Sequence, residues 1–262
     1  MRRATFIAYV VLVHGLLALV LWKSDFFVRV EQKLGAPPSV QEITDHYKRM
    51  LHYHVRMDQN VPDNSVVFIG DSLTQGLCAD AVAFPSVNYW IGGDTTVGVL
   101  GRLPEYRSLH RASAVVLAIG VNDMKFRENQ HIVQNYRRIL QILPQAVPLV
   151  CSAVLPVNEA MMAPGKVTNA RIRDLNASLK TLCSEDARCV FVDVGSSLVD
   201  AGGNLSTAFQ DGDGVHLKNA GNRIWIDELR IAVRKAQQGG PVNGSQPSRS
   251  GADRTSAVDS RR

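Results

Sequence analysis

The fold of this chain is decided by the stretch Val66-Val67-Phe68-Ile69-Gly70-Asp71-Ser72-Leu73, where an apolar run leads into a small polar segment. A short, continuously apolar run bounded by turn residues is typical of a strand buried in a parallel sheet. Ser72 then falls where the strand ends and a helix begins, at the sheet edge where α/β proteins bind ligands. A serine in this place is either a helix N-cap or a nucleophile. The stretch alone leaves both interpretations open.

Beyond residue 65 the chain alternates between strand-like and helix-like segments. Apolar runs predict strands at 66–69, 87–91, 114–119, 147–153 and 189–194. Helical patterns lie at 95–107, 128–143, 166–183 and 219–237. Such alternation indicates right-handed βαβ units, so we expect an α/β fold with a mainly parallel sheet covered by helices on both faces.

Length and charge narrow the class of protein. With 262 residues, 45% of them hydrophobic and 20% charged, the chain can form one sizeable core but is short for two full domains. The formal net charge is +5, yet the basic residues are scattered and form no stripe interleaved with aromatic residues. Nucleic acid is therefore not an expected partner.

The N-terminus predicts attachment to a membrane. Residues 4–22 contain no charged side chain and approach the ~20 residues that a spanning helix needs. We expect a retained anchor rather than a cleaved signal peptide, because the apolar run exceeds the usual ~7–15 residues of such peptides. Basic residues lie on both sides of the run, so the positive-inside rule leaves the orientation open.

The cysteines bear on the compartment. Cys183 and Cys189 lie close enough to close a small disulfide loop, or they are two ordinary buried thiols. An oxidised pair would favour an extracytoplasmic domain, periplasmic if the protein is bacterial. The sequence thus predicts a single-pass membrane protein whose main domain lies outside the cytoplasm. Cys78 and Cys151 are predicted to be core residues.

Four segments are predicted along the chain: an anchor (1–23), a linker with an amphipathic helix (24–63), a catalytic domain (64–237) and a disordered tail (238–262). The capping box Ser39-Val40-Gln41-Glu42 precedes the amphipathic helix. The tail has almost no large apolar residues with which to order itself. In the amphipathic helix, His52 and His54 are two residues apart and point to different faces, so we expect surface or half-buried side chains rather than a metal pair.

Three further blocks follow predicted strands. The glycine loop Gly92-Gly93-Asp94 could turn backbone N–H groups toward developing negative charge, or could form a simple turn. Gly120-Val121-Asn122-Asp123 follows the strand at 114–119 and offers a side-chain N–H donor. In Asp213-Gly214-Val215-His216 the spacing lets the carboxylate orient the imidazole through one ring nitrogen while the other acts as a base.

Taken in this order, the four blocks resemble the SGNH hydrolase superfamily, the GDSL esterases and lipases. The resemblance covers roughly residues 64–236, and residues 91–102 are most similar to the branch that contains platelet-activating factor acetylhydrolase catalytic subunits. It implies a three-layer α/β/α fold around a mainly parallel, flavodoxin-like five-stranded sheet.

The resemblance also implies roles for individual residues. Ser72 would be the nucleophile, His216 its general base and acid, and Asp213 the residue that orients the imidazole. Gly93 N–H, the Asn122 side chain and the N–H of Ser72 itself would form the oxyanion hole. No metal or organic cofactor is implied, and the acids next to these blocks, Asp71 and Asp123, are interpreted as structural.

The predicted function is a membrane-anchored serine ester hydrolase that works through an acyl-serine intermediate, for example a lysophospholipase or an acetylesterase. Its substrate would be a small-molecule, lipid or glycan ester, and Met161 and Met162 could form an apolar lip for an acyl chain. One alternative is an O-acyltransferase or deacetylase acting on cell-envelope polysaccharide or lipid. Another is a non-catalytic binding protein on the same fold. The oligomeric state is left open.

Overall fold

The computed structural model describes residues 2–23, 42–162 and 165–239. The chain divides into two units, residues 1–44 and 45–262, and the first contains helix α1 (Arg2–Lys23). In the described part of the chain, no helix is long and apolar enough to cross a membrane. The anchor predicted for residues 4–22 includes side chains from residue 18 onward that lie outside the description, and it stays a prediction.

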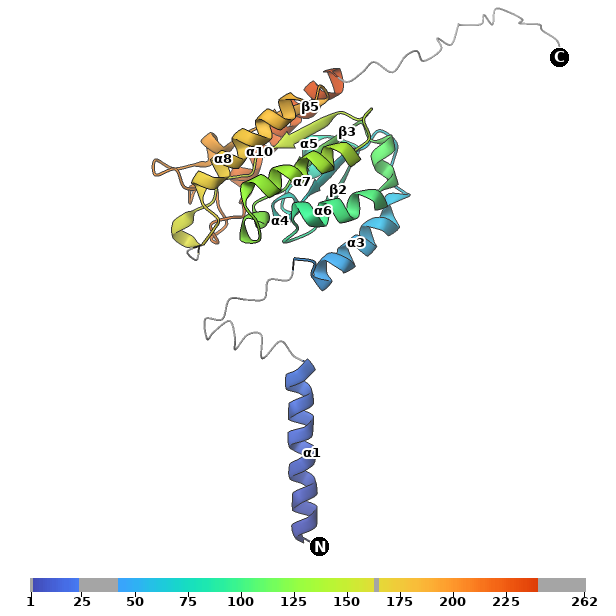
Figure 1. Cartoon of the computed structure of the whole chain (residues 1–262), viewed down its shortest axis with the longest axis vertical. Coiled ribbons are helices and arrows are strands. Elements are labelled where there is room, and N and C mark those ends of the chain that lie inside the picture. The colour runs from blue at the N-terminus through green and yellow to red at the C-terminus, as the bar shows by residue number, and fades with distance from the viewer. Residues whose placement is uncertain (1, 24–41, 163–164, 240–262) are drawn as a thin grey trace, which may run out of the picture. The chain divides into compact units, whose positions relative to one another are not determined.

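The second unit is built on one sheet of five parallel strands in the order β2-β1-β3-β4-β5 (Figure 1). The strands are β1 (Val66–Gly70), β2 (Ser86–Trp90), β3 (Ala114–Ala118), β4 (Leu149–Ser152) and β5 (Cys189–Val192). This is the flavodoxin-like order, and it confirms the predicted parallel sheet. Strand β1 lies between β2 and β3, where the strand order reverses, so its carboxyl end opens into the crevice that such folds use for ligands.

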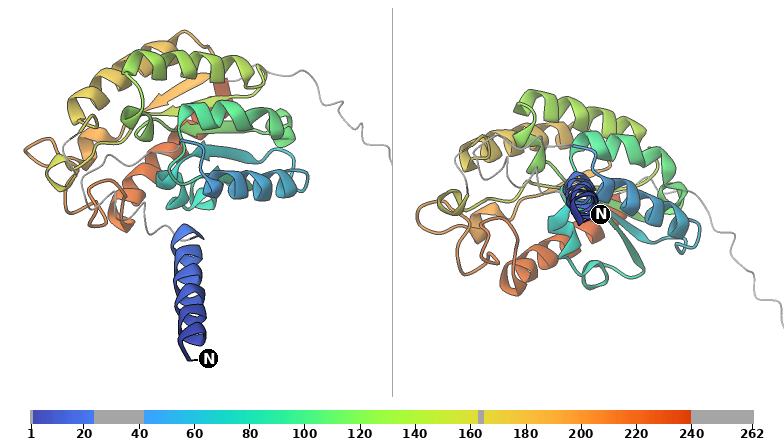
Figure 2. Two further views of the ribbon diagram at one scale, coloured as in Figure 1. Left: turned by 60° about the horizontal axis from the view of Figure 1, so that its bottom comes forward. Right: turned by 90° about the horizontal axis from the view of Figure 1, so that it is seen from below.

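Helices cover both faces of the sheet (Figures 1 and 2). The longer ones are α3 (Asp45–Asp58), α6 (Thr96–Arg102), α7 (Asn129–Ile142), α8 (Asn169–Ser184) and α10 (Asn219–Gly239). Single turns of α-helix form α4 (Ser72–Gln75), α5 (Ala79–Val82) and α9 (Gly195–Leu198). Short 3₁₀ segments form η1 (Leu103–Glu105), η2 (Arg107–Arg111), η3 (Asn122–Lys125) and η4 (Glu159–Met161). The helix predicted at 95–107 ends earlier, at Arg102, because Pro104 lacks the N–H that would continue it.

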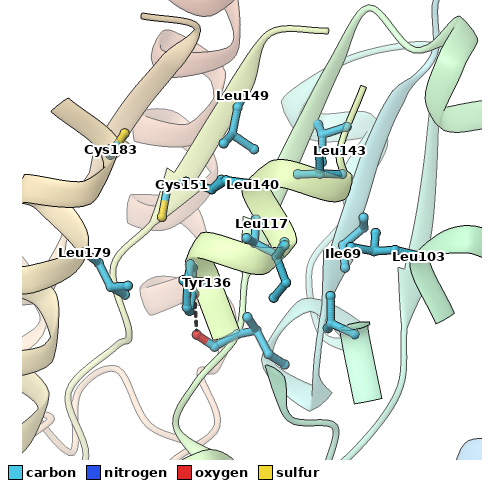
Figure 3. Packing of buried hydrophobic residues seen from close by; sticks show 14 of the residues in the cluster. Ile69, Leu103, Leu117, Tyr136, Leu140, Leu143, Leu149, Cys151, Leu179 and Cys183 are labelled. Carbon is cyan, nitrogen blue, oxygen red and sulfur yellow. Dashed lines mark hydrogen bonds between the residues drawn. The ribbon is translucent and has the colours of Figure 1, made fainter. Parts of the chain in front are cut away.

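Side chains of β1 alternate between two hydrophobic cores. Val67 and Ile69 belong to the cluster under α6, α7 and α8, part of which Figure 3 shows. Val66 and Phe68 belong to the cluster under α10, which includes the fully buried Trp225. All five residues of β1 are buried. The strand that leads to Ser72 is therefore held from both sides, which makes it a rigid support for whatever follows it.

One predicted histidine environment is wrong. His52 is exposed as expected, but His54 is buried at 3% exposure and its Nδ1 lies 3.1 Å from the Tyr106 hydroxyl. Burial, helped by the nearby charge of Arg102, lowers the pKa of His54 to about 4. Within the second unit, helix α3 packs against Tyr89 and Tyr106 through this residue. A side chain on the packed face of an amphipathic helix is covered even when it is polar.

The environments of the four cysteines agree with the prediction only in part. Cys183 at the end of α8 and Cys189 at the start of β5 form a disulfide. Cys151 is buried in β4 as predicted, and burial raises the pKa of its thiol to about 12. Cys78 is exposed, so its prediction as a core residue is wrong. It precedes the short helix α5, where the chain runs over the surface.

Two predicted segments fall outside the described residues: most of the capping box, at 39–41, and the tail from residue 240 onward. The predicted limits of the four segments likewise stay predictions.

The disulfide makes a prediction about thiol reactivity. Protein exported to an oxidising compartment and denatured without reductant should expose two titratable thiols, those of Cys78 and Cys151, and four after reduction. Because the cross-link restricts the unfolded chain, the Cys183→Ser/Cys189→Ser variant should lose about 2 kcal/mol of unfolding free energy in urea titrations. Cys78→Ser is the matched control and should be close to neutral. Four reactive thiols before reduction would contradict the cross-link.

Candidate active site

Ser72 is the first residue of α4, directly past the carboxyl end of β1. Position 70, the last of β1, requires glycine because a Cβ there would lie only 2.5 Å from the carbonyl oxygen of Ala118 on β3. Asp71 is the helix N-cap, and its Oδ1 accepts the Leu73 N–H at 2.9 Å. Asp71, not Ser72, therefore takes the capping role that the sequence left open for the serine. The Ser72 side chain is free for another use.

Three side chains from opposite ends of the domain meet at this point. His216 Nε2 lies 2.7 Å from Ser72 Oγ, although 144 residues separate them. His216 Nδ1 lies 2.5 Å from Asp213 Oδ2. A carboxylate only accepts, so Nδ1 carries the ring proton and Nε2 of the neutral ring accepts from the serine hydroxyl. This is the geometry in which a histidine can take a proton from serine.

The loop that carries these two residues is held by hydrogen bonds to its backbone from the Gln210 side chain and from Asn158. Gln210 Oε1 accepts the N–H groups of Gly212 and Gly214, at 2.5 and 3.1 Å. The Gly214 carbonyl accepts the Asn158 N–H at 2.7 Å. Gly214 has φ +80°, which an L-residue rarely adopts. The histidine thus stands on a fixed loop rather than on a free one.

Asp213 is held as a carboxylate. Partial burial acts to raise its pKa, but hydrogen bonds from the His216 ring and from the His216 and Val215 N–H groups lower the pKa to about 2. The side chains of His216 and Asp213 are 41% and 50% exposed. The chain of contacts Ser72–His216–Asp213, here called the relay, is therefore open to solvent, where substrate and water can reach it.

The glycine loop forms a tight turn beside Ser72. The Asp94 N–H donates to the Ile91 carbonyl at 3.0 Å, and Gly93, the third residue of the turn, has φ +77°. A positive φ at this position is typical of a type II turn, which favours glycine. In the described part of the chain neither the Gly93 N–H nor the Ser72 N–H donates to a protein acceptor. Both are spare donors at the same edge of the sheet.

Asn122 lies at the start of η3 and is 9% exposed. Its Nδ2 is 3.2 Å from the Asp94 carbonyl and 3.4 Å from Asp71 Oδ2, so it bridges the glycine loop and the serine segment. Lys125 Nζ donates to Asn122 Oδ1 at 3.1 Å. An ammonium only donates, so it fixes the amide with its oxygen toward the lysine and its NH₂ toward the site.

Arg102 connects the serine segment and the glycine loop from the interior of the domain. Its guanidinium is fully buried and pairs with Asp94 Oδ2 at 2.9 Å. It also donates to the carbonyl of Tyr89 at 2.6 Å and to that of Gly70 at 3.1 Å. A buried cation is tolerated only when its donors are satisfied. These bonds tie the ends of β1 and β2 to the glycine loop.

Three buried acids pack around the site. Burial raises the pKa of Asp71 to about 7, against the lowering effect of the Leu73 N–H. Burial also raises the pKa of Asp94 to about 6, although the charge of Arg102 lowers it. Asp123 accepts from Thr96 and pairs with Arg127. All three bond to backbone or neighbouring side chains, in line with the structural reading of Asp71 and Asp123.

No cation site is evident nearby. Within residues 2–23, 42–162 and 165–239, no three His, Cys, Asp or Glu side chains come together as metal ligands.

The structure brings together all five predicted site residues and adds two that the sequence did not single out. Ser72, Gly93, Asn122, Asp213 and His216 lie in loops or at the first residues of short helices along one sheet edge. Arg102 was missed because a basic residue in the last turn of a helix normally interacts with solvent and the helix dipole. Lys125 was missed as an ordinary surface lysine, although its spacing of three residues from Asn122 in a short helical turn was a usable signal. Of the predicted apolar lip, Met161 lies against Gly214 and Met162 packs on the core.

A parallel α/β sheet with a serine, a histidine and spare N–H donors at its carboxyl edge is the architecture of a serine-dependent hydrolase. The model of the GDSL-like Lipase/Acylhydrolase family matches residues 68–224, more than half of the chain. The chain therefore belongs to this family, and it is a carboxylic ester hydrolase.

Known relatives and structures agree with this assignment. Human platelet-activating factor acetylhydrolase IB subunit alpha1 is 26% identical over 225 residues, which cover 81% of this chain and 96% of that protein. The rat protein of the same name is 26% identical over 184 residues, which cover 67% of this chain and 78% of that protein. A GDSL-like lipase from Bacteroides thetaiotaomicron shares the fold, with a TM-score of 0.61 and 22% identity over 72% of this chain and 98% of that one.

The buried arginine makes a prediction about stability. Arg102→Met leaves Asp94 buried without its partner, so the unfolding free energy should fall by about 3–5 kcal/mol in urea titrations. Arg111→Met is the matched control, because the pair of Arg111 with Asp63 is largely exposed and should be worth about 0–1 kcal/mol. Equal, small losses in the two variants would show that Arg102 does not hold the loops together.

Proposed function

We propose that this enzyme hydrolyses carboxylic esters at Ser72 through an acyl-serine intermediate. The observation that carries the proposal is the 2.7 Å contact between His216 Nε2 and Ser72 Oγ, with Asp213 on the other ring nitrogen. Serine is a weak nucleophile until a base takes its proton, and this contact places the base within reach.

In the first half-reaction Ser72 Oγ forms a bond to the ester carbonyl carbon while its proton passes to His216 Nε2. The carbonyl oxygen becomes an oxyanion, and Asp213 stabilises the imidazolium. When this intermediate collapses, the bond to the alcohol oxygen breaks and His216 returns the proton to that oxygen. The acyl group is left on Ser72.

Three donors serve the oxyanion in this proposal: the N–H groups of Ser72 and Gly93 and the Nδ2 of Asn122. The first two have no protein acceptor in the described residues. The third is aimed by Lys125. Donors placed in advance stabilise developing charge without reorganisation, and losing one typically costs about 10²–10³ in turnover.

In the second half-reaction water takes the place of the alcohol. His216 accepts a proton from water as its oxygen attacks the acyl carbonyl, and then protonates Ser72 Oγ as the acyl bond breaks. The released acid diffuses from a site that is half open to solvent. The enzyme returns to its starting state without a cofactor.

The proposed substrates are esters with a short acyl group, acetyl first. Support comes from the human relative, whose name specifies an acetylhydrolase. Met161 adds an apolar surface beside the loop of His216, because it lies against Gly214 and is 45% exposed. The alcohol portion can be large, because the relay faces solvent.

We further propose that the enzyme works outside the cytoplasm, held at a membrane by residues 4–22. The stretch without charged residues supports the attachment. The disulfide of Cys183 and Cys189 supports an oxidising compartment, because such bonds are rare where thiols are kept reduced.

The proposal is tested with a fluorophosphonate probe and p-nitrophenyl esters of increasing chain length on the full chain. Wild type should be labelled at Ser72, and Ser72→Ala should lose the label and at least about 10⁴ of kcat. Asn122→Ala should lose about 10²–10³ of kcat while remaining labelled more slowly. Ser178→Ala, which removes an exposed serine on α8, is the matched control and should match wild type.

Two outcomes would contradict this proposal. One is a Ser72→Ala variant that hydrolyses esters as fast as wild type, and the other is a label on a different residue. The acetyl preference fails separately if activity rises steadily with acyl length.

Lys125 gives a second test, a double-mutant cycle with Asn122. Lys125→Met should lower kcat about three- to tenfold, because the Asn122 amide loses the charged donor that orients it. In an Asn122→Ala background the same change should have little effect, and Lys125→Arg should restore most of the activity. Losses that simply add would mean that Lys125 does not act through Asn122.

A further inference from the structure

A groove of about 470 Å³ lies along the β5 edge of the sheet, between α8 on one side and β5 with α9 on the other. None of Ser72, Gly93, Asn122, Asp213 and His216 lines it. Its volume falls within the ~300–1,000 Å³ typical of small-molecule sites. The groove is therefore large enough for a ligand and separate from the proposed catalytic relay.

The floor of the groove is mainly hydrocarbon, and the two buried amides of the lining, Asn169 and Asn176, are both bonded to backbone. Val154, Ile172 and Phe191 contribute apolar surface, and the first two are buried at 5% and 3% exposure. Asn176 also reaches the floor, but its Oδ1 accepts the Val154 N–H at 2.8 Å and its Nδ2 donates to the Val154 carbonyl at 2.9 Å. A ligand body that fits this floor is itself apolar, because a peptide or sugar would lose its hydrogen bonds there.

The rim of the groove carries two unused positive charges. Arg173 and Lys180 both line it and are exposed on α8, seven residues apart, so they lie on the same face two turns from each other. Neither has a hydrogen bond or an ion pair with another described residue. Asp193 contributes the only carboxylate of the lining, and its Oδ1 accepts the Gly195 N–H at 2.8 Å. The rim therefore keeps an excess of positive charge.

We propose that this groove binds a single-chain fatty acid in its carboxylate form. The acyl chain lies on the apolar floor, and the carboxylate pairs with Arg173 and Lys180. Arginine presents a planar fork that matches a carboxylate, while lysine adds a point charge. An apolar floor with cations at one rim selects against neutral lipids and against small anions without a chain. None of these residues takes part in the proposed chemistry at Ser72.

Isothermal titration of dodecanoate, below its micelle concentration, into the full-length Ser72→Ala protein tests this site without turnover. One binding site is expected, with the same affinity in wild type. Acetate, which has the carboxylate without the chain, should show no binding. Dodecyltrimethylammonium, which has the chain and the opposite charge, should bind at least about tenfold more weakly.

Two variants locate the ligand. Arg173→Glu/Lys180→Glu should weaken dodecanoate binding about tenfold or more, whereas Arg234→Glu/Lys235→Glu, on the exposed side of α10, is the charge-matched control and should leave it unchanged. Ala177→Trp, at an exposed position in the groove wall, should fill the groove and abolish binding without disturbing the fold. Circular dichroism and urea midpoints verify that each variant is folded.

The proposal is overturned if dodecanoate does not bind wild type, if the cationic amphiphile binds equally well, or if Ala177→Trp binds like its parent. The proposed function is contradicted by a different result, which is probe labelling and ester hydrolysis that do not depend on Ser72. Ala177→Trp should keep its ester hydrolysis, so the two proposals stand or fall separately.

Discussion

The guanidinium of Arg102 is the interaction on which the rest of the site depends. It is wholly buried, and it joins the carboxylate of Asp94 to the carbonyls at the ends of β1 and β2. Those strand ends lead into the serine segment and the glycine loop. A buried charge with each nitrogen bonded is strongly directional, so it sets the distance between the two loops in a way that apolar packing alone does not. Loss of Arg102 or of Asp94 would leave the other as an unpaired buried charge.

Around Arg102 the site has a buried side, called the back, and a solvent-exposed side, called the front. The back consists of buried polar groups, among them Asp71, Asp123 and Asn122, which are bonded to backbone or to one another. The front is the loop of Asp213 and His216, half exposed and held by Gln210 and Asn158. In the proposed mechanism the buried groups fix where developing charge is received, and the loop of His216 supplies the moving proton. The arrangement separates precise positioning from access to solvent.

The sequence predicts much of this because the information is local. Strand β1 is apolar at every position and Ser72 follows it directly, so the fold class and the position of the candidate nucleophile follow from adjacent residues. The missing parts depend on contacts between distant segments. His54 looks like a surface histidine until Tyr106 covers it, and Arg102 looks like a helix-terminal charge until three other segments close around it. The groove beside α8 likewise cannot be predicted from the sequence, since its walls come from separate elements.

The central claim is that Ser72 receives the acyl group while donors from three loops receive the oxyanion. A crystal structure of the fluorophosphonate adduct tests it most directly, because the phosphoryl oxygen stands in for that oxyanion. The account predicts phosphorus bonded to Ser72 Oγ, with the oxygen about 2.7–3.1 Å from Gly93 N and Asn122 Nδ2. A phosphoryl oxygen that points to solvent, with those two donors unengaged, would contradict it.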